Sequence, residues 1–175
     1  MHQAFSAYLE HLAAVQKSPL TIRRYHDVLE ELDRVARSEG VDVATLARPA
    51  LQRFASSPRR DGSPRSPAGT NLRVAVLKAV FTWLAREQLA PGNPAAALVG
   101  IPEPRRVPKY LTTTEVHRLL DHVARKGGNL DQRNIALVVT FWQTAHRVSE
   151  LARLQIAQLD RERRELRDVL VKGGH

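Results

Sequence analysis

Apolar side chains recur every three or four residues in the first part of the chain, a spacing that predicts amphipathic helices. The first of these helices is expected over residues 3–16. The second begins after Ser18, a favoured N-cap residue, with Pro19 at its first position. It ends before Gly40, because glycine readily takes the left-handed conformation that closes a helix.

Two further stretches predict a third and a fourth helix with a loop between them. The third is expected over residues 43–56. Residues 57–69 (SPRRDGSPRSPAG) are rich in serine, proline, glycine and arginine, which predicts a basic loop. Thr70 or Asn71 can then cap a fourth helix, in which Trp83 belongs to the apolar stripe and is expected in the core. These four helices form one predicted domain.

A proline-rich basic segment, residues 101–110, follows the fourth helix. It contains three prolines in the stretch IPEPRRVPK, and the residue before each proline is restricted to extended conformations. We therefore expect an extended linker here. It separates a first domain, residues 1–100, from a second, residues 111–175.

The second domain opens with a capping box. Thr112 and Glu115 have the spacing at which each side chain bonds the backbone N–H of the other residue, which predicts a helix start. The next helix begins near Asp131 and is apolar around almost its whole circumference, so we expect it to be buried on every side. After a charged turn, residues 165–171 alternate as in a strand, and residues 172–174 (KGG) suit a hairpin tip.

Arg147 occupies the position with the most suggestive chemistry. The apolar helix stops at Thr144, and a short amphipathic helix begins at Val148. Arg147 therefore stands at a helix start, where both its forked guanidinium and the helix N-terminus favour a phosphate. The alternative is an arginine that only caps and solvates this helix.

Composition favours a nucleic acid as the partner. The 175 residues have a formal net charge of +9, an excess that suits a polyanion. A generally arginine-rich composition of the source organism is the alternative. The sequence has no cysteine, which excludes disulfides and cysteine-based zinc sites, and we expect no metal and no cofactor. With neither a signal-peptide pattern nor a long apolar run, we expect a cytoplasmic protein without a membrane partner.

Several motifs resemble those of one protein family. Residues 144–151 (TAHRVSEL) are similar to the T-G-x-R-x-S-E-L box of the tyrosine site-specific recombinases, which include phage integrases and Xer-type resolvases. Residues 108–116 (PKYLTTTEV) resemble the start of their catalytic domain, and residues 18–29 resemble the second helix of their core-binding domain. The resemblance implies a mainly α fold: a four-helix core-binding (SAM-like) domain followed by the N-terminal part of a mixed α/β catalytic domain.

The resemblance also implies roles for individual residues. Arg147 is expected to hold the scissile phosphate and Lys172 to protonate the leaving 5′ oxygen, and we expect Glu150 to orient Arg147 through an ion pair. Ala145 replaces the family's glycine and is strained if this position needs a positive φ angle. Contacts to duplex DNA, mainly to its phosphates, are expected from Thr21, Arg23, Arg24, Thr70, Asn71, Arg73, Lys78, Arg105 and Arg106. Without the resemblance, Lys172 is an ordinary turn residue, and Arg23 and Arg24 belong to a solvated face.

The family's cleavage chemistry is incomplete in these residues. It requires a tyrosine nucleophile and a second arginine downstream of the hairpin lysine, whereas the three tyrosines here are Tyr8, Tyr25 and Tyr110. We therefore expect a fragment or truncated member of the family that binds double-stranded DNA, with other recombinase protomers as further partners, and that does not cleave DNA by itself. A DNA-binding transcriptional regulator and a helical protein-interaction module with a basic surface are the alternatives.

Overall fold

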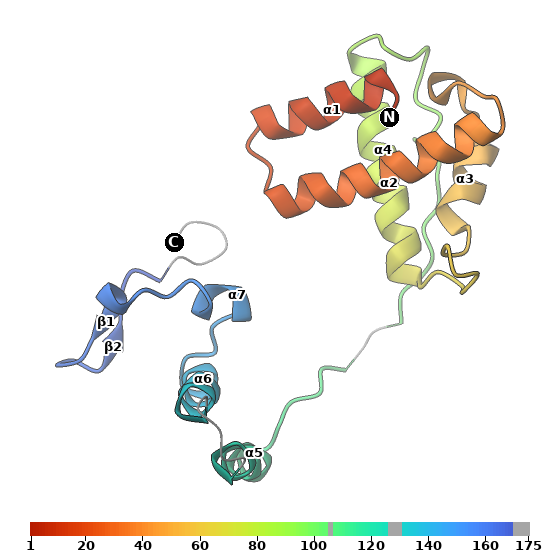
Figure 1. Cartoon of the computed structure of the whole chain (residues 1–175). Coiled ribbons are helices and arrows are strands. Elements are labelled where there is room, and N and C mark those ends of the chain that lie inside the picture. The colour runs from red at the N-terminus through yellow and green to blue at the C-terminus, as the bar shows by residue number, and fades with distance from the viewer. Residues whose placement is uncertain (105–106, 126–130, 170–175) are drawn as a thin grey trace. The chain divides into compact units, whose positions relative to one another are not determined.

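The computed structural model describes residues 1–104, 107–125 and 131–169 (Figure 1). Within those residues it contains seven α-helices and one two-stranded antiparallel sheet. The chain divides into two compact units, Met1–Arg106 and Val107–His175. This division falls inside the proline-rich segment that the sequence marks as a linker. None of the described helices is both long enough and apolar enough to cross a membrane.

The described part of the first unit is a bundle of four α-helices around one apolar core (Figure 1). α4 packs against each of the other three helices and is the central element. The fully buried side chains include Phe5, Leu29, Leu51 and Phe81, each of which contributes about 1.5–3 kcal/mol on burial. The four helices are α1 (Gln3–Ala14), α2 (Pro19–Ser38), α3 (Arg48–Ser56) and α4 (Pro67–Arg86).

The ends of α2 follow the local signals in the sequence. The Ser18 hydroxyl accepts a hydrogen bond from the Thr21 N–H at 3.2 Å, which caps the first turn. At the other end Gly40 has a φ angle of +68°, and the Val41 N–H donates to the Ala36 carbonyl at 2.9 Å. This is the Schellman arrangement that satisfies the last carbonyls of a helix. Both predicted ends are confirmed.

The prediction of one continuous third helix over residues 43–56 is wrong. A single 3-10 turn, η1 (Val43–Thr45), comes first, and α3 begins only at Arg48. The cause is Pro49, which has no N–H to donate to the preceding turn and whose ring collides with that turn's carbonyl. A proline is therefore tolerated in the first turn of α3 but not in the middle of a longer helix.

The fourth helix begins earlier than the sequence analysis predicted. Ser66 is its N-cap and accepts a hydrogen bond from the Gly69 N–H at 3.2 Å, with Pro67 as the first helical residue. Thr70 and Asn71 therefore lie within α4 and cap nothing. The signal was present, since Ser66-Pro67 repeats the Ser-Pro pair that starts α2. The basic loop is consequently residues 57–66.

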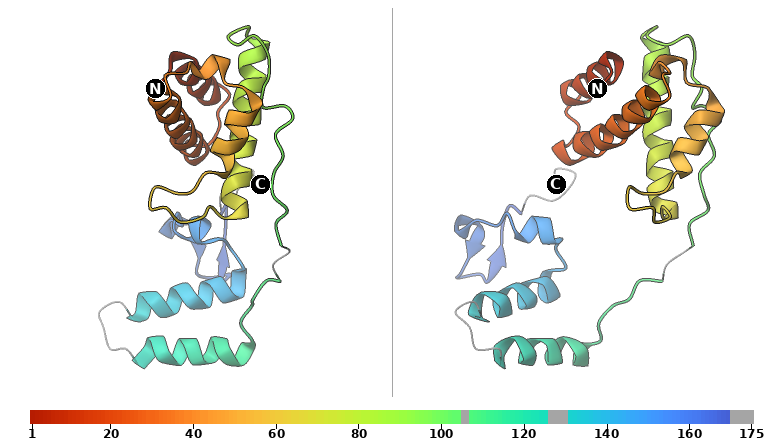
Figure 2. Two further views of the ribbon diagram at one scale, coloured as in Figure 1. Left: turned by 90° about the vertical axis from the view of Figure 1, so that its right-hand side faces the viewer. Right: turned by 45° about the vertical axis from the view of Figure 1, so that its right-hand side comes forward.

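The chain after α4 runs back along the first unit (Figure 2). The Gln52 side chain on α3 exchanges two hydrogen bonds of 3.1 Å with the backbone of Val99. The Asn71 side chain on α4 likewise exchanges two hydrogen bonds, both of 2.8 Å, with the backbone of Ile101. A Cβ atom on Gly100 would lie 2.6 Å from Asn71 Oδ1, so only glycine allows this close approach.

The second unit begins with the predicted capping box. The Thr112 N–H donates to Glu115 Oε2 at 2.8 Å, and the Glu115 N–H donates to Thr112 Oγ1 at 3.3 Å. These bonds start the first of three helices, α5, which pairs with α6. The described elements of this unit are α5 (Thr113–Arg125), α6 (Asp131–Thr144), α7 (Val148–Leu151), the 3-10 turn η2 (Ile156–Gln158), β1 (Leu159–Asp160) and β2 (Glu165–Leu166).

The expectation that α6 is buried on every side is wrong for this chain. None of its residues is buried, and the side chains of Leu137 and Trp142 are 40% and 46% exposed. The apolar circumference of α6 needs neighbours on all sides, and α5 is its main neighbour among the described helices.

The strand expected over residues 165–171 is shorter in the described residues, where β2 covers only Glu165 and Leu166. Leu159 pairs with Leu166 and Asp160 with Glu165, so the described tip is the charged turn over residues 161–164. The described strand ends at Leu166, because Asp168 has a φ angle of +51° and cannot continue an extended strand. The predicted tip at residues 172–174 lies outside the described residues.

Candidate phosphate and nucleic-acid interface

A left-handed residue leads the chain from α6 to Arg147. α6 ends at Thr144, and the next residue, Ala145, has a φ angle of +53°. Its N–H still bonds the Phe141 carbonyl at 3.0 Å, as in a helix that has just ended. The positive φ considered in the sequence analysis is therefore present, and alanine is strained there by about 1 kcal/mol relative to glycine.

Glu150 holds Arg147 at two points. Arg147 is the N-cap of α7, and its backbone N–H donates to Glu150 Oε2 at 2.8 Å. Its Nη1 donates to Glu150 Oε1 at 3.1 Å, which is the ion pair expected from the sequence. The carboxylate side chain is only 6% exposed, whereas the arginine side chain is 68% exposed. Glu150 therefore anchors a guanidinium group that remains open to solvent.

At this position the guanidinium, and not the helix, is the group that could hold an anion. α7 has only four residues, too few for a substantial macrodipole. A guanidinium presents five N–H donors in a plane, and Glu150 uses one of them, at Nη1. The remaining donors match the oxygens of a phosphate. Lys172, the residue expected to act beside Arg147, lies outside the described residues.

Three of the expected DNA-contacting residues in the first unit carry exposed positive charge. Arg23 and Arg24 are exposed in the first turns of α2, and Lys78 is exposed on α4. Thr21 is half-buried, with its Oγ1 at 2.8 Å from the Ser18 hydroxyl. Arg105 and Arg106 lie outside the described residues.

Two of the expected contact residues on α4 are buried or already bonded within the chain. Thr70 is 1% exposed, so its hydroxyl is not available at the surface. The Asn71 amide is occupied by the chain after α4, because its Nδ2 also donates to Glu103 Oε1 at 2.8 Å. Asn71 thus fastens residues 101–103 to the helical bundle.

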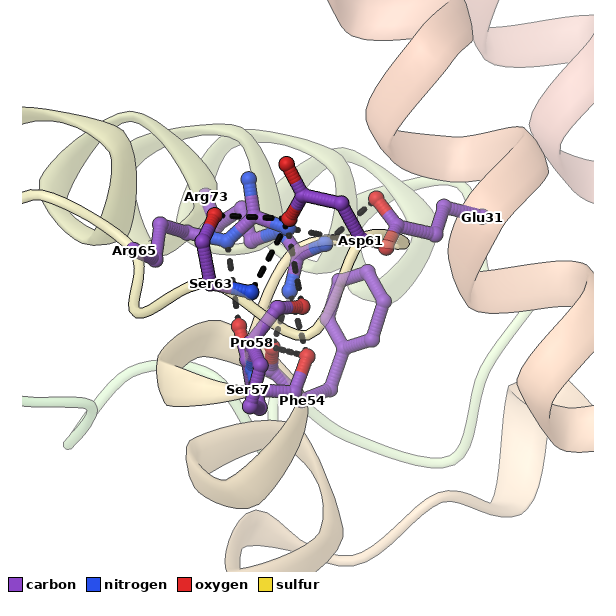
Figure 3. A network of polar contacts seen from close by, with 8 residues as sticks. All are labelled: Glu31, Phe54, Ser57, Pro58, Asp61, Ser63, Arg65 and Arg73. Atoms are coloured by element: carbon purple, nitrogen blue, oxygen red, sulfur yellow. Dashed lines mark hydrogen bonds and ion pairs between the residues drawn. The ribbon is translucent and has the colours of Figure 1, made fainter.

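The prediction that Arg73 lies off the apolar stripe is wrong, because its side chain is only 1% exposed and leaves no free surface for the expected DNA contact. Figure 3 shows its polar contacts. Arg73 forms an ion pair with Glu31 of α2, and its Nη1 donates to the Phe54 carbonyl and, at 2.7 Å, to Ser57 Oγ. Its guanidinium carbon lies 4.3 Å from the centre of the Phe54 ring, a cation–π contact. The acidic partner on another helix allows a charged side chain to be buried here.

Comparison with known proteins identifies the family. The N-terminal SAM-like domain of phage integrases matches residues 5–88. Tyrosine recombinase XerC of Shewanella amazonensis is 34% identical over 158 residues, an alignment that covers 90% of this chain and 51% of the relative. XerC of Escherichia coli O157:H7 is 30% identical over 168 residues, which cover 95% of this chain and 55% of the relative. The chain belongs to the tyrosine recombinase family.

The fold agrees with this assignment. The matched residues 5–88 cover the four helices of the first unit except the first two residues of α1, and these helices form the SAM-like core-binding domain. The mainly helical second unit, with its single small sheet in the described part, corresponds to the start of a catalytic domain. The chain spans about half the length of the curated relatives it matches.

The sequence analysis missed the residues that shape the loop between α3 and α4. Arg65 is half-buried, and its Nε donates to the Ser57 carbonyl at 3.2 Å. Glu31 pairs with both Arg65 and Arg73. The charges were visible in the sequence, but no local pattern connects a glutamate on α2 with arginines that follow α3.

Proposed function

We propose that these 175 residues bind duplex DNA through its phosphates, in the DNA strand exchange and integration reactions of a tyrosine recombinase. Arg147 then holds the scissile phosphate. The observation that carries this proposal is the anchoring of an exposed guanidinium by a buried carboxylate, at the arginine of the recombinase box. We also propose that other recombinase protomers are partners of this chain and that it is located in the cytoplasm.

The geometry of Arg147 suits a phosphate for two reasons. A charge-assisted hydrogen bond between a guanidinium and a phosphate is worth about 1.5–3 kcal/mol. The ion pair with Glu150 already restricts the side chain, so less conformational entropy is lost when the phosphate binds. An unanchored lysine at the same place would lack both the planar fork and this restriction.

The first unit supplies contacts that position the duplex. Arg23, Arg24 and Lys78 are exposed, and the whole chain has a formal net charge of +9. Such contacts reach phosphates on any sequence and fix the register of a protein on DNA without reading its bases. Their contribution falls steeply as salt rises, because binding releases condensed counterions.

We further propose that the 175 residues do not cleave DNA by themselves. A nucleophilic tyrosine must lie within hydrogen-bonding reach of the groups that activate it. Burial, and to a smaller extent the neighbouring Tyr25, raises the pKa of Tyr8 to about 12, which opposes formation of a phenolate. Tyr25 packs against Tyr8 in the helical bundle. Tyr110 is 84% exposed and precedes the second unit's first helix.

Two measurements on the full chain test the proposal. Gel retardation of a duplex between 50 and 200 mM salt should show an affinity that falls by a factor of about 10³ or more, as expected for six or more phosphate contacts. Incubation with a nicked suicide duplex should give no covalent protein–DNA adduct on a denaturing gel. Salt-independent retardation would contradict phosphate-led binding, and a phosphotyrosyl adduct would contradict the proposed lack of cleavage.

A further inference from the structure

The basic loop between α3 and α4, residues 57–66, is closed by its own hydrogen bonds. The Arg59 N–H donates to the Ser63 carbonyl at 2.9 Å, and the Gly62 N–H donates to the Arg59 carbonyl at 3.0 Å. Asp61 Oδ1 accepts from both the N–H and the hydroxyl of Ser63, at 2.9 and 2.6 Å (Figure 3). These bonds from Ser63, helped by Arg59, lower the pKa of Asp61. The loop therefore has a defined shape before any ligand binds.

The loop is also fastened to the helices beside it. Arg65 reaches from the end of the loop to its beginning, where Nε donates to the Ser57 carbonyl at 3.2 Å. Its Nη2 lies 3.6 Å from Glu31 on α2, and the buried Arg73 pairs with the same carboxylate. Two arginines thus neutralise Glu31, which leaves little negative charge under the loop.

A surface hollow between the loop and α2 is lined mainly by arginines. Arg34, Arg59 and Arg60 are exposed at its edge, and no ion pair occupies any of the three in the described part of the chain. The hollow carries more positive than negative charge, since Glu31 is already neutralised. The lining residues are Asp27, Glu31, Arg34, Arg59, Arg60 and Arg65.

We propose that this hollow binds a backbone phosphate of duplex DNA, an inference that rests on the proposed function and adds a contact surface to it. Guanidinium groups from two elements surround the hollow, and such forks match phosphate oxygens. The internal and anchoring bonds order the loop in advance, which lowers the entropic cost of binding. The surface continues the predicted contact on α2, because residues 24, 27, 31 and 34 share one face of that helix.

A pair of charge-matched variants tests this site in gel retardation with the 175-residue chain and a duplex of about 30 base pairs. Arg59→Ala/Arg60→Ala removes the two exposed loop arginines, and Arg48→Ala/Arg53→Ala removes two exposed arginines from α3. Both variants lower the net charge by two. The loop variant should bind about 10-fold or more weakly near 0.1 M salt, and its log–log salt slope should fall by about 1.8. The α3 variant should change affinity by less than about 3-fold.

The outcomes separate this inference from the function on which it rests. Equal losses in the two variants, or no loss in the loop variant, would overturn the loop site while DNA binding by the unaltered chain stands. No retardation by the unaltered chain would overturn both. Unfolding should be the same for the two variants and the parent, because all four arginines are exposed, and this comparison excludes a loss of fold as the cause.

Discussion

Replacing Arg73 with alanine should destabilise the first helical unit and should not act mainly on DNA binding. The substitution removes the ion pair with Glu31 and the hydrogen bonds to the Phe54 carbonyl and the Ser57 hydroxyl. It also removes the contact with the Phe54 ring. Breaking a buried ion pair by removing one partner costs about 3–5 kcal/mol. A domain of this size has about 5–15 kcal/mol in total, so the loss is a large fraction. The midpoint of thermal unfolding should fall by at least about 12 °C.

The assay is denaturant unfolding of the full chain followed by the fluorescence of Trp83, which packs against both Tyr8 and His11 in the first unit. A Trp142→Phe background removes the signal of the second unit. Arg24→Ala is the matched control, since this arginine is exposed and should change stability by no more than about 0.5 kcal/mol.

A second substitution tests the ion pair itself. Glu31→Ala should also destabilise the unit, and the double variant with Arg73→Ala should lose less than the sum of the two, because both remove the same interaction. The reasoning would be refuted if Arg73→Ala unfolded at the same denaturant concentration as Arg24→Ala. If Arg73→Ala then also lost DNA affinity, Arg73 would have the DNA-contacting role that was predicted from the sequence.

Three further predictions concern the second unit and the linker. In gel retardation at fixed salt, Arg147→Ala should weaken DNA binding by about 1.5–3 kcal/mol and Arg147→Lys by less. Equal affinities of the two variants and the parent chain would count against a phosphate contact. Ala145→Gly should stabilise the second unit by up to about 1 kcal/mol in urea unfolding, because φ is +53°, and a loss of stability would show that this strain is absent. Limited proteolysis should cut within residues 101–110 before any helix, and a resistant fragment that spans residues 95–115 would argue against the division into two units.

Local signals in the sequence predicted the fold well wherever a few neighbouring residues decide the conformation. Ser18 and Gly40 fix the two ends of α2 through their own backbone and cap hydrogen bonds. Thr112 and Glu115 do the same for the start of α5. The resemblance of residues 144–151 to the recombinase box also led to the prediction that Glu150 pairs with Arg147, and this ion pair spans a single helical turn.

The failures have a common physical cause, which is that burial depends on partners distant in the chain. Arg73 looks like a surface residue until Glu31 is brought beside it by the packing of α2 against α4. α6 has the composition of a buried helix, yet burial requires neighbours on every side. The start of α4 is a different case, since the Ser66-Pro67 signal was local and was overlooked in favour of Thr70 and Asn71.

The attachment of residues 99–103 to the first unit shortens the tether between the two units. Gln52 and Asn71 fix the backbone as far as Ile101, and Asn71 also holds Glu103. Between Glu103 and the capping box at Thr112 the chain can span at most roughly 30 Å. Once one unit has bound a polyanion, the other searches a volume set by this short reach, which corresponds to an effective concentration on the order of millimolar. Two individually weak phosphate-binding surfaces would then act together, and Gly100→Ala, by loosening the attachment, would lower their joint avidity without touching either surface.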